Sequence, residues 1–172
     1  MSMPLRAALA AAILLSAPQA QAHAVADPNK GIAGNYFRTA IRITHGCHGA
    51  PTVAVKVAIP EGVLSVKAQP KPGWTIAMTK RELAQPIAGQ HGHPITHAVT
   101  EVEWRGGPLG DEEFDEFGLS MRLPAQAGRR LWFAVTQTCT EGEIRWSDVP
   151  AEGQPWGSVP NPAPFVTLEP PR

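Results

Sequence analysis

Apolar and polar residues alternate along nine short segments of the chain, and each segment has one mainly apolar side. In the first of them, Phe37, Thr39, Ile41 and Ile43 share one face. A period of two is typical of a β-strand that is buried on one side. We therefore predict strands at Tyr36–Thr44, Thr52–Ile59, Val63–Lys67, Trp74–Thr79, Ala98–Trp104, Phe117–Leu123, Leu131–Thr138, Glu143–Trp146 and Phe165–Leu168.

The breaks between these segments contain the residues that turns require. Pro60-Glu61-Gly62 and Lys71-Pro72-Gly73 are two examples. The chain holds 18 prolines and 16 glycines, and no long window shows a convincing helical period. Short strands at this spacing predict an all-β fold, an antiparallel β-sandwich.

A length of 172 residues corresponds to about one domain. We assign the sandwich to residues 23–150 and a proline-rich C-terminal segment, packed on the domain or extending from it, to residues 151–172. Two stretches differ from the rest. Arg81–His97 is expected to form an extended surface hairpin or loop, and Pro150–Pro164 to lie along the surface in an extended form.

The first 22 residues have the composition of a secretory signal peptide. Arg6 precedes an apolar run, and Ala20-Gln21-Ala22 matches an A-x-A cleavage site. The run is shorter than the roughly 20 residues that a membrane-spanning helix needs, so cleavage is favoured over a retained anchor. We expect an exported protein, periplasmic or secreted, with no integral membrane segment after cleavage.

Charge excludes several classes of partner. Removing residues 1–22 takes away Arg6 and no acid, leaving 14 basic against 15 acidic residues. Such a balance argues against nucleic acid and against anionic membranes as partners. The sequence also lacks a G-x-S-x-G elbow and the phosphate-binding glycine patterns. Covalent hydrolase chemistry therefore has no support.

Cleavage after Ala22 would make His23 the first residue of the mature protein. An N-terminal histidine offers its α-amine and its imidazole Nδ1, which can chelate one metal ion in a six-membered ring. The alternative is that a histidine follows the cleavage site by chance.

The two cysteines, Cys47 and Cys139, allow one intramolecular disulfide. An exported protein meets oxidising conditions in which such a bond persists, so we favour a disulfide that joins the two halves of the chain. The alternative is a thiolate site for Cu(I) that includes the nearby His45 and His48.

Other candidate ligands have weaker support. His91, His93 and His97 lie in a Gly/Pro-containing stretch without rigid support, so they are solvated side chains or a weak accessory metal site. The acidic run beginning at Asp111 is either a solvated turn or the source of a carboxylate ligand. Trp146, at the end of a predicted strand, is a core residue or covers a metal.

The order of several short motifs resembles the YcnI-like copper-binding family of exported bacterial proteins. The resemblance covers the chain from His23 to about Pro150 and rests on His23-Ala24, Gly31–Gly34, Pro70-Lys71-Pro72-Gly73-Trp74, Val102-Glu103-Trp104 with Gly106-Gly107, Phe114-Asp115-Glu116-Phe117 and Ile144-Arg145-Trp146.

The resemblance implies a cupredoxin-like or immunoglobulin-like β-sandwich that holds Cu(II) in a monohistidine brace. His23 would chelate the ion, Asp111 would supply a carboxylate, and the Trp146 indole would lie beside the metal. This chain has Asp where relatives carry Glu, so Glu112 and Glu113 are possible substitutes.

We therefore expect a copper-binding protein of copper homeostasis or delivery, with another copper-trafficking protein as a possible partner, and no enzymatic activity. One alternative is a histidine-brace copper oxygenase, which would need a second histidine from among His45, His48, His91, His93 and His97. The other is a β-sandwich interaction module that binds no metal.

Overall fold

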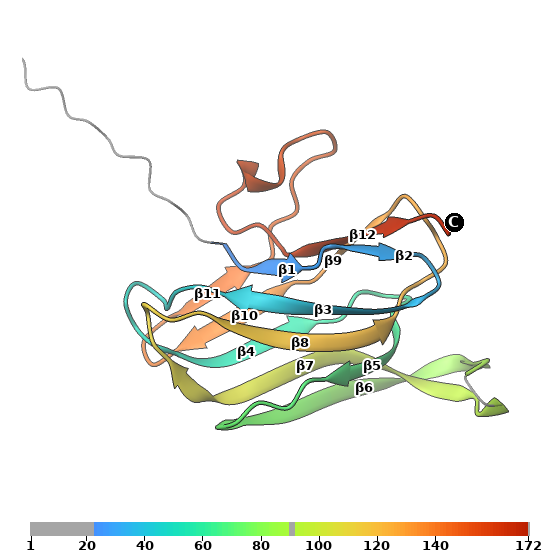
Figure 1. Cartoon of the computed structure of the whole chain (residues 1–172), viewed down its shortest axis with the longest axis horizontal. Helices are drawn as coiled ribbons and strands as arrows, with labels where there is room; N and C mark the ends of the chain where they lie inside the picture. The colour runs from blue at the N-terminus through green and yellow to red at the C-terminus, as the bar shows by residue number, and fades with distance from the viewer. Residues whose placement is uncertain (1–22, 90–91, 172) are drawn as a thin grey trace, which may run out of the picture.

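The computed structural model describes residues 23–89 and 92–171, and the predicted signal peptide lies outside them. The described chain forms strands and one short 3-10 helix, η2 (Figure 1). The elements are β1 (Val25–Asp27), β2 (Lys30–Ile32), β3 (Tyr36–Ile43), β4 (Thr52–Ala58), β5 (Leu64–Ala68), β6 (Trp74–Ile87), β7 (Ile95–Leu109), β8 (Asp115–Arg122), β9 (Arg130–Trp132), β10 (Val135–Cys139), β11 (Glu143–Trp146), η2 (Trp156–Ser158) and β12 (Phe165–Glu169).

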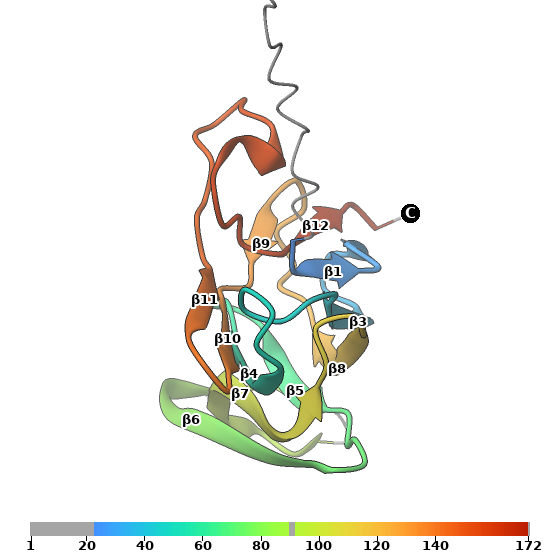
Figure 2. The same ribbon diagram turned by 90° about the vertical axis from the view of Figure 1, so that its left-hand side faces the viewer.

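Two sheets form the layers of a sandwich. One has the strand order β1-β3-β8-β5 and the other β11-β10-β4-β7-β6, and Figure 2 shows β1, β3 and β8 on one side with β11, β10 and β4 on the other. A third sheet, β2-β12-β9, contains the one parallel pair of the described strands, β2 with β12. The predicted all-β sandwich is confirmed, with antiparallel pairing everywhere else.

The alternation of β3 produces the core as predicted. Thr39, Ile41 and Ile43 are buried, whereas Arg38 on the opposite face is exposed. Ile41 pairs with Phe117 of β8, whose ring packs edge-on against Trp104 with centroids 5.6 Å apart. Burying such side chains contributes about 1.5–3 kcal/mol each to the free energy of unfolding.

The segment predicted as one strand at Leu131–Thr138 is divided between two sheets. β9 pairs with β12 and β10 pairs with β4. Between them, the amide of Phe133 donates to the Pro164 carbonyl at 2.8 Å, and the amide of Ala58 donates to the Ala134 carbonyl at 2.8 Å. The apolar alternation continues through this break, so the sequence pattern does not reveal it.

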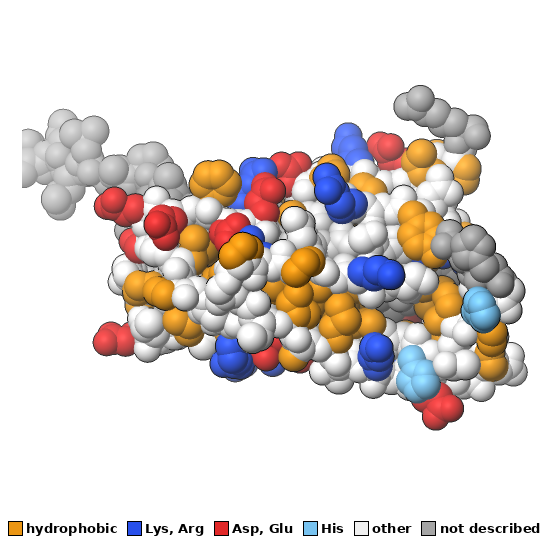
Figure 3. Space-filling view, turned by 60° about the horizontal axis from the view of Figure 1, so that its bottom comes forward, with side chains coloured by type: hydrophobic (Ala, Val, Ile, Leu, Met, Phe, Trp, Pro, Cys, Tyr) orange, Lys and Arg blue, Asp and Glu red, His pale blue; other side chains and the backbone are white. Residues whose placement is uncertain are grey.

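The stretch Arg81–His97 belongs to a long hairpin formed by β6 and β7, in agreement with the expected surface hairpin. His93 and His97 are both exposed near its end, where Figure 3 shows histidine side chains. In Figure 1 this end of the hairpin projects at the right, whereas β1 starts in the left half of the molecule. His91 lies outside the described residues.

The Cys47–Cys139 disulfide is present, with the Cα atoms 5.9 Å apart and 92 residues apart in sequence. It joins the loop after β3 to the end of β10. His48 and Gly49 both have positive φ, 53° and 92°, as in the tight turns that favour glycine or asparagine. Cys47 and Ala50 exchange backbone hydrogen bonds of 2.9 and 3.0 Å across this turn.

Among residues 23–89 and 92–171, no helix is long and apolar enough to span a membrane.

Candidate metal centre

His23 immediately precedes β1, an edge strand that pairs with β3 through Val25 and Arg42. The His23 side chain is half-buried, and its Nε2 is fully shielded, with no hydrogen-bond partner in the part of the chain that the structure describes. An unpartnered buried nitrogen is uncommon in native proteins and calls for an explanation such as an unseen water or ion.

Two indoles enclose the His23 ring. Its centroid lies 5.9 Å from Trp146 and 5.1 Å from Trp156, with interplanar angles of 75° and 66°. Trp146 is the last residue of β11 and is 4% exposed, whereas Trp156 begins η2. The imidazole therefore sits edge-on to aromatic rings from two separate elements.

Trp156 was not anticipated as part of the site, because the expected extended conformation of Pro150–Pro164 is incorrect. The segment instead forms a loop above β1 that contains η2 (Figure 1). Asp148 and Asn161 close its base, since the Asp148 amide donates to the Asn161 carbonyl at 2.9 Å and the Asp148 carboxylate accepts from the Asn161 amide at 3.0 Å. The Trp156 Nε1 donates to the Ala163 carbonyl at 2.8 Å. The one sign of this role in the sequence is Trp156 itself, a large apolar side chain in a proline-rich segment.

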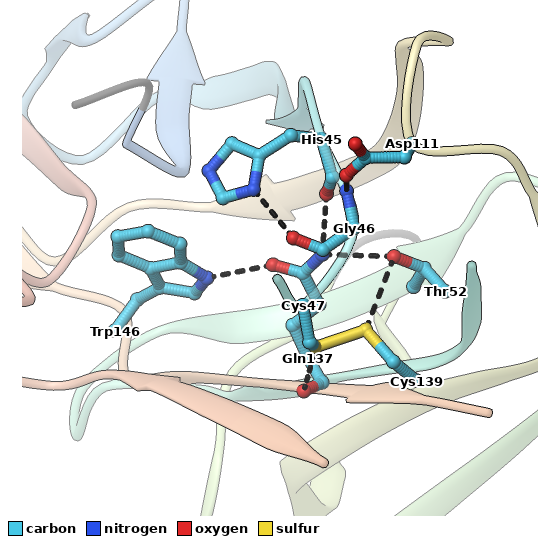
Figure 4. The surroundings of a disulfide bond; sticks show 8 residues. All are labelled: His45, Gly46, Cys47, Thr52, Asp111, Gln137, Cys139 and Trp146. Carbon is cyan, nitrogen blue, oxygen red and sulfur yellow. Dashed lines mark hydrogen bonds between the residues drawn. A yellow bond between two sulfur atoms is a disulfide. The ribbon is translucent and has the colours of Figure 1, made fainter. Parts of the chain in front are cut away.

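Gln137, which is fully buried in β10, holds the Trp146 indole by a hydrogen bond. Its Oε1 accepts from the Trp146 Nε1 at 3.0 Å, and its Nε2 donates to the His45 carbonyl at 2.6 Å and to the Thr52 hydroxyl at 2.8 Å. One amide side chain thus ties the indole to the backbone of the loop after β3 (Figure 4). The sequence pattern gave no sign of this role, because Gln137 occupies an ordinary inward position of a strand.

The His45 ring contacts the same indole. Its centroid lies 5.9 Å from that of Trp146 at an interplanar angle of 74°. Both His23 and His45 therefore pack edge-on against Trp146. From the sequence, His45 is one of several possible second histidines and a neighbour of Cys47 in the alternative Cu(I) site, but nothing in the pattern places the loop after β3 next to β11.

Asp111 is hydrogen-bonded to the loop after β3. Its Oδ1 accepts a hydrogen bond of 2.8 Å from the Gly46 amide, and the side chain is otherwise exposed. Figure 4 shows Asp111 and Trp146 on opposite sides of the Gly46 backbone. A Cβ at Gly46 would collide with the Ala50 carbonyl oxygen, so glycine permits this tight loop.

The neighbouring acids are occupied by local contacts. Glu113 Oε2 accepts from the Gly110 amide at 2.8 Å, and Glu112 lines an open depression beside Phe114 and Arg42. Hydrogen bonds from Arg42 to Glu116 and then to Asp27 raise the pKa of Arg42 above its ordinary value. The Arg42 guanidinium thus links Asp27 of β1 to Glu116 of β8 through ion pairs.

Within the part of the chain that the structure describes, no group of three or more His, Cys, Asp or Glu side chains is close enough to hold a metal ion. The structure therefore brings together His23, Trp146 and Trp156, with His45 on the same indole. That His23 and Asp111 bind one metal ion stays a prediction. The Cys47 and Cys139 thiols are consumed by their disulfide and are not available as thiolate ligands.

Comparison with known proteins supports this architecture. A structure described as an uncharacterized protein from Nocardia farcinica with an immunoglobulin-like fold is 28% identical and has a TM-score of 0.63, with 86% of this chain and 98% of that chain covered. A putative membrane anchored protein from Corynebacterium diphtheriae matches at 10% identity and a TM-score of 0.38, over 84% of this chain and 34% of that chain, a likeness too weak to argue from. No curated protein matches.

A family model described as a domain of unknown function, DUF1775, matches residues 23–168. The match starts at His23 and runs into β12. The chain therefore belongs to the DUF1775 family, which includes the YcnI-like proteins.

Proposed function

We propose that the protein is exported, is cleaved after Ala22 and binds one Cu(II) ion through the amine and imidazole of His23, in order to hold copper or pass it on. The observation that carries the proposal is the His23 imidazole, which two indoles enclose and whose buried Nε2 has no hydrogen-bond partner among the described residues, so that Nδ1 is the nitrogen that would bind the metal. The disulfide supports export, because such bonds persist in oxidising compartments.

Chelation through Nδ1 requires the His23 tautomer that carries its hydrogen on Nε2, and the surroundings of the ring suit that tautomer. A metal bound at Nδ1 leaves the hydrogen on Nε2, the atom that lacks a hydrogen-bond partner. The edge-on arrangement with Trp146 and Trp156 suits an N–H group directed at an aromatic ring. The amine and Nδ1 then supply two nitrogen donors, and Cu(II) favours nitrogen and oxygen donors in a tetragonal arrangement.

The surroundings of His23 suit a protein that carries copper better than one that catalyses a reaction with it. Copper at His23 would lie beside the Trp146 and Trp156 indoles, which limit the approach of water and of reductants to that side. The proposal includes no catalytic step, and a second copper-trafficking protein is the expected partner.

The experiment compares the mature protein beginning at His23 with the same protein carrying one additional glycine before His23. Each is titrated with Cu(II) by calorimetry, with tryptophan fluorescence recorded in parallel, since copper beside two indoles should quench them. We expect one bound ion in the mature protein and an affinity at least about tenfold lower, or about 1.4 kcal/mol weaker, in the extended form.

The His23→Ala variant is the matched control, and it should lose both the high-affinity heat and the quenching. Circular dichroism checks that all three proteins are folded. Equal affinity in the three proteins would overturn the proposal.

A further inference from the structure

A row of three polar side chains crosses the outer face of the β1-β3-β8-β5 sheet. Arg38 of β3 pairs with Ser120 of β8, and Ser120 pairs with Lys67 of β5 on its other side. All three residues are exposed, and their strands lie side by side in Figure 1. Residues directly opposite one another on antiparallel strands share one face of the sheet, so two cations flank one hydroxyl.

A bulge in β5 directs Lys67 to this face. The register shifts between Leu64 and Lys67, where β5 advances by three residues against two of β8. Ser65, inside this bulge, has a positive φ of 52°, a conformation that residues other than glycine seldom adopt. Bulges change the direction in which side chains point. Here the bulge leaves Val66 buried and turns Lys67 outward, whereas uninterrupted alternation from Leu64 would point Lys67 towards the core.

The two cations of the row have no acidic partner. Among residues 23–89 and 92–171, neither Arg38 nor Lys67 forms an ion pair. The neighbouring rows across β3 and β8 pair Tyr36 with Arg122 and Ala40 with Gly118. They contribute a third cation and no acid. Like charges that face one another on a sheet are destabilising, and the whole chain is formally neutral. The excess of positive charge is therefore local and lacks a counter-charge.

The row borders an open depression of about 190 Å³, which Arg38, Lys67, Gln69, Gly118 and Ser120 help to line. Gly118 contributes no side chain to it, and a Cβ at this position would collide with Gln69 Oε1. Pockets for drug-sized ligands usually measure about 300–1,000 Å³. The depression therefore suits a small ion or a single charged group better than a large organic molecule.

We propose that this depression binds a phosphate group, with Arg38 and Lys67 as the charged donors and Ser120 as a hydroxyl donor. A guanidinium offers paired N–H groups that match two phosphate oxygens, and an ammonium adds a compact charge. A hydroxyl donates one further hydrogen bond. The site shares no residue with the candidate metal centre, so the inference is independent of the proposed function. Free phosphate and a lipid headgroup present the same chemistry, and the experiment separates them.

The test titrates the isotope-labelled mature protein, without added metal, with sodium phosphate at constant ionic strength while amide NMR shifts are recorded. We expect saturable shifts around Arg38, Lys67 and Ser120. The double variant Arg38→Gln with Lys67→Gln should bind at least about tenfold more weakly, because both charged donors are lost. Ser120→Ala should bind roughly fivefold more weakly, because one neutral hydrogen bond is lost.

Lys80→Gln is the matched control, because it removes a cation from an exposed position of another strand, β6. It should bind phosphate as the wild type does. The amide spectrum of each variant shows directly whether the protein is folded, and the substituted residues are all exposed, so the fold should be retained.

Sedimentation with phosphatidylglycerol vesicles distinguishes the source of the phosphate group. Saturable binding of inorganic phosphate identifies a free ion, whereas binding to the vesicles alone, lost in the double variant, identifies a lipid headgroup. Shifts spread over all the basic residues, equal affinities in the double variant and Lys80→Gln, or no binding of either probe would overturn the proposal. Each of these results leaves copper binding at His23 unaffected.

Discussion

At the scale of single residues, the buried amide of Gln137 does most to shape the candidate metal centre. It satisfies the Trp146 indole nitrogen, the His45 carbonyl and the Thr52 hydroxyl at once. The bonds to the indole nitrogen and to the hydroxyl are buried and the bond to the carbonyl is partly buried, and leaving a buried polar group unsatisfied costs about 1–3 kcal/mol. The positions of the Trp146 indole and of the His45 backbone thus both depend on the Gln137 side chain.

Replacing Gln137 with leucine should lower the free energy of unfolding by at least about 2 kcal/mol, because three polar partners lose their hydrogen bonds. Urea denaturation measures this change. Gln126→Leu makes the same chemical change in an exposed turn and should stay within about 0.5 kcal/mol of the wild type. Equal effects of the two substitutions would contradict the structural role of Gln137.

At the scale of elements, β12 converts the C-terminal segment into part of the fold. It lies between β2 and β9, and Val166 and Leu168 are almost fully buried. The carbonyl of Ala163, just before this strand, accepts the hydrogen bond from Trp156. The placement of η2 over His23 therefore depends on β12 at one end and on the Asp148–Asn161 contact at the other.

Val166→Ala should destabilise the protein by about 2 kcal/mol, since it removes two methyl-sized groups from a fully buried position. Val149→Ala, just before the C-terminal segment, is the matched control, because Val149 is 54% exposed, and it should change stability by less than about 0.5 kcal/mol. Thermal and urea unfolding of both variants provide the measurement. A Val166 variant as stable as the control would mean that β12 does not belong to the cooperative core.

At the scale of the whole molecule, the disulfide joins the two halves of the chain, because it links the loop after β3 to the end of β10. A cross-link across 92 residues contributes about 4–5 kcal/mol in the chain-entropy account. It also keeps the loop that carries His45 next to β10, and β10 pairs with β11, the strand that ends at Trp146. Stability and the geometry of the candidate site therefore share the same cross-link.

The alternation of β3 and β4 was sufficient to predict a sandwich and its core faces, because local burial patterns repeat every two residues. It could not show the break near Phe133, where the apolar alternation continues from one sheet into another. The grouping of His23, His45 and Trp156 around Trp146 depends on contacts between distant segments, which no local pattern encodes. The prediction that Asp111 binds copper rests on resemblance alone and stays a prediction; in the structure its Oδ1 accepts a hydrogen bond from the Gly46 amide.

The position of copper tests the central claim most directly. Crystals of the mature protein grown with Cu(II) would be measured at the copper absorption edge, and an anomalous difference map would locate the ion. We predict a single strong peak bonded to the amine and Nδ1 of His23, beside the Trp146 indole. A peak at the far end of the hairpin near His93 and His97, or an ordered His23 without a peak, would contradict the account.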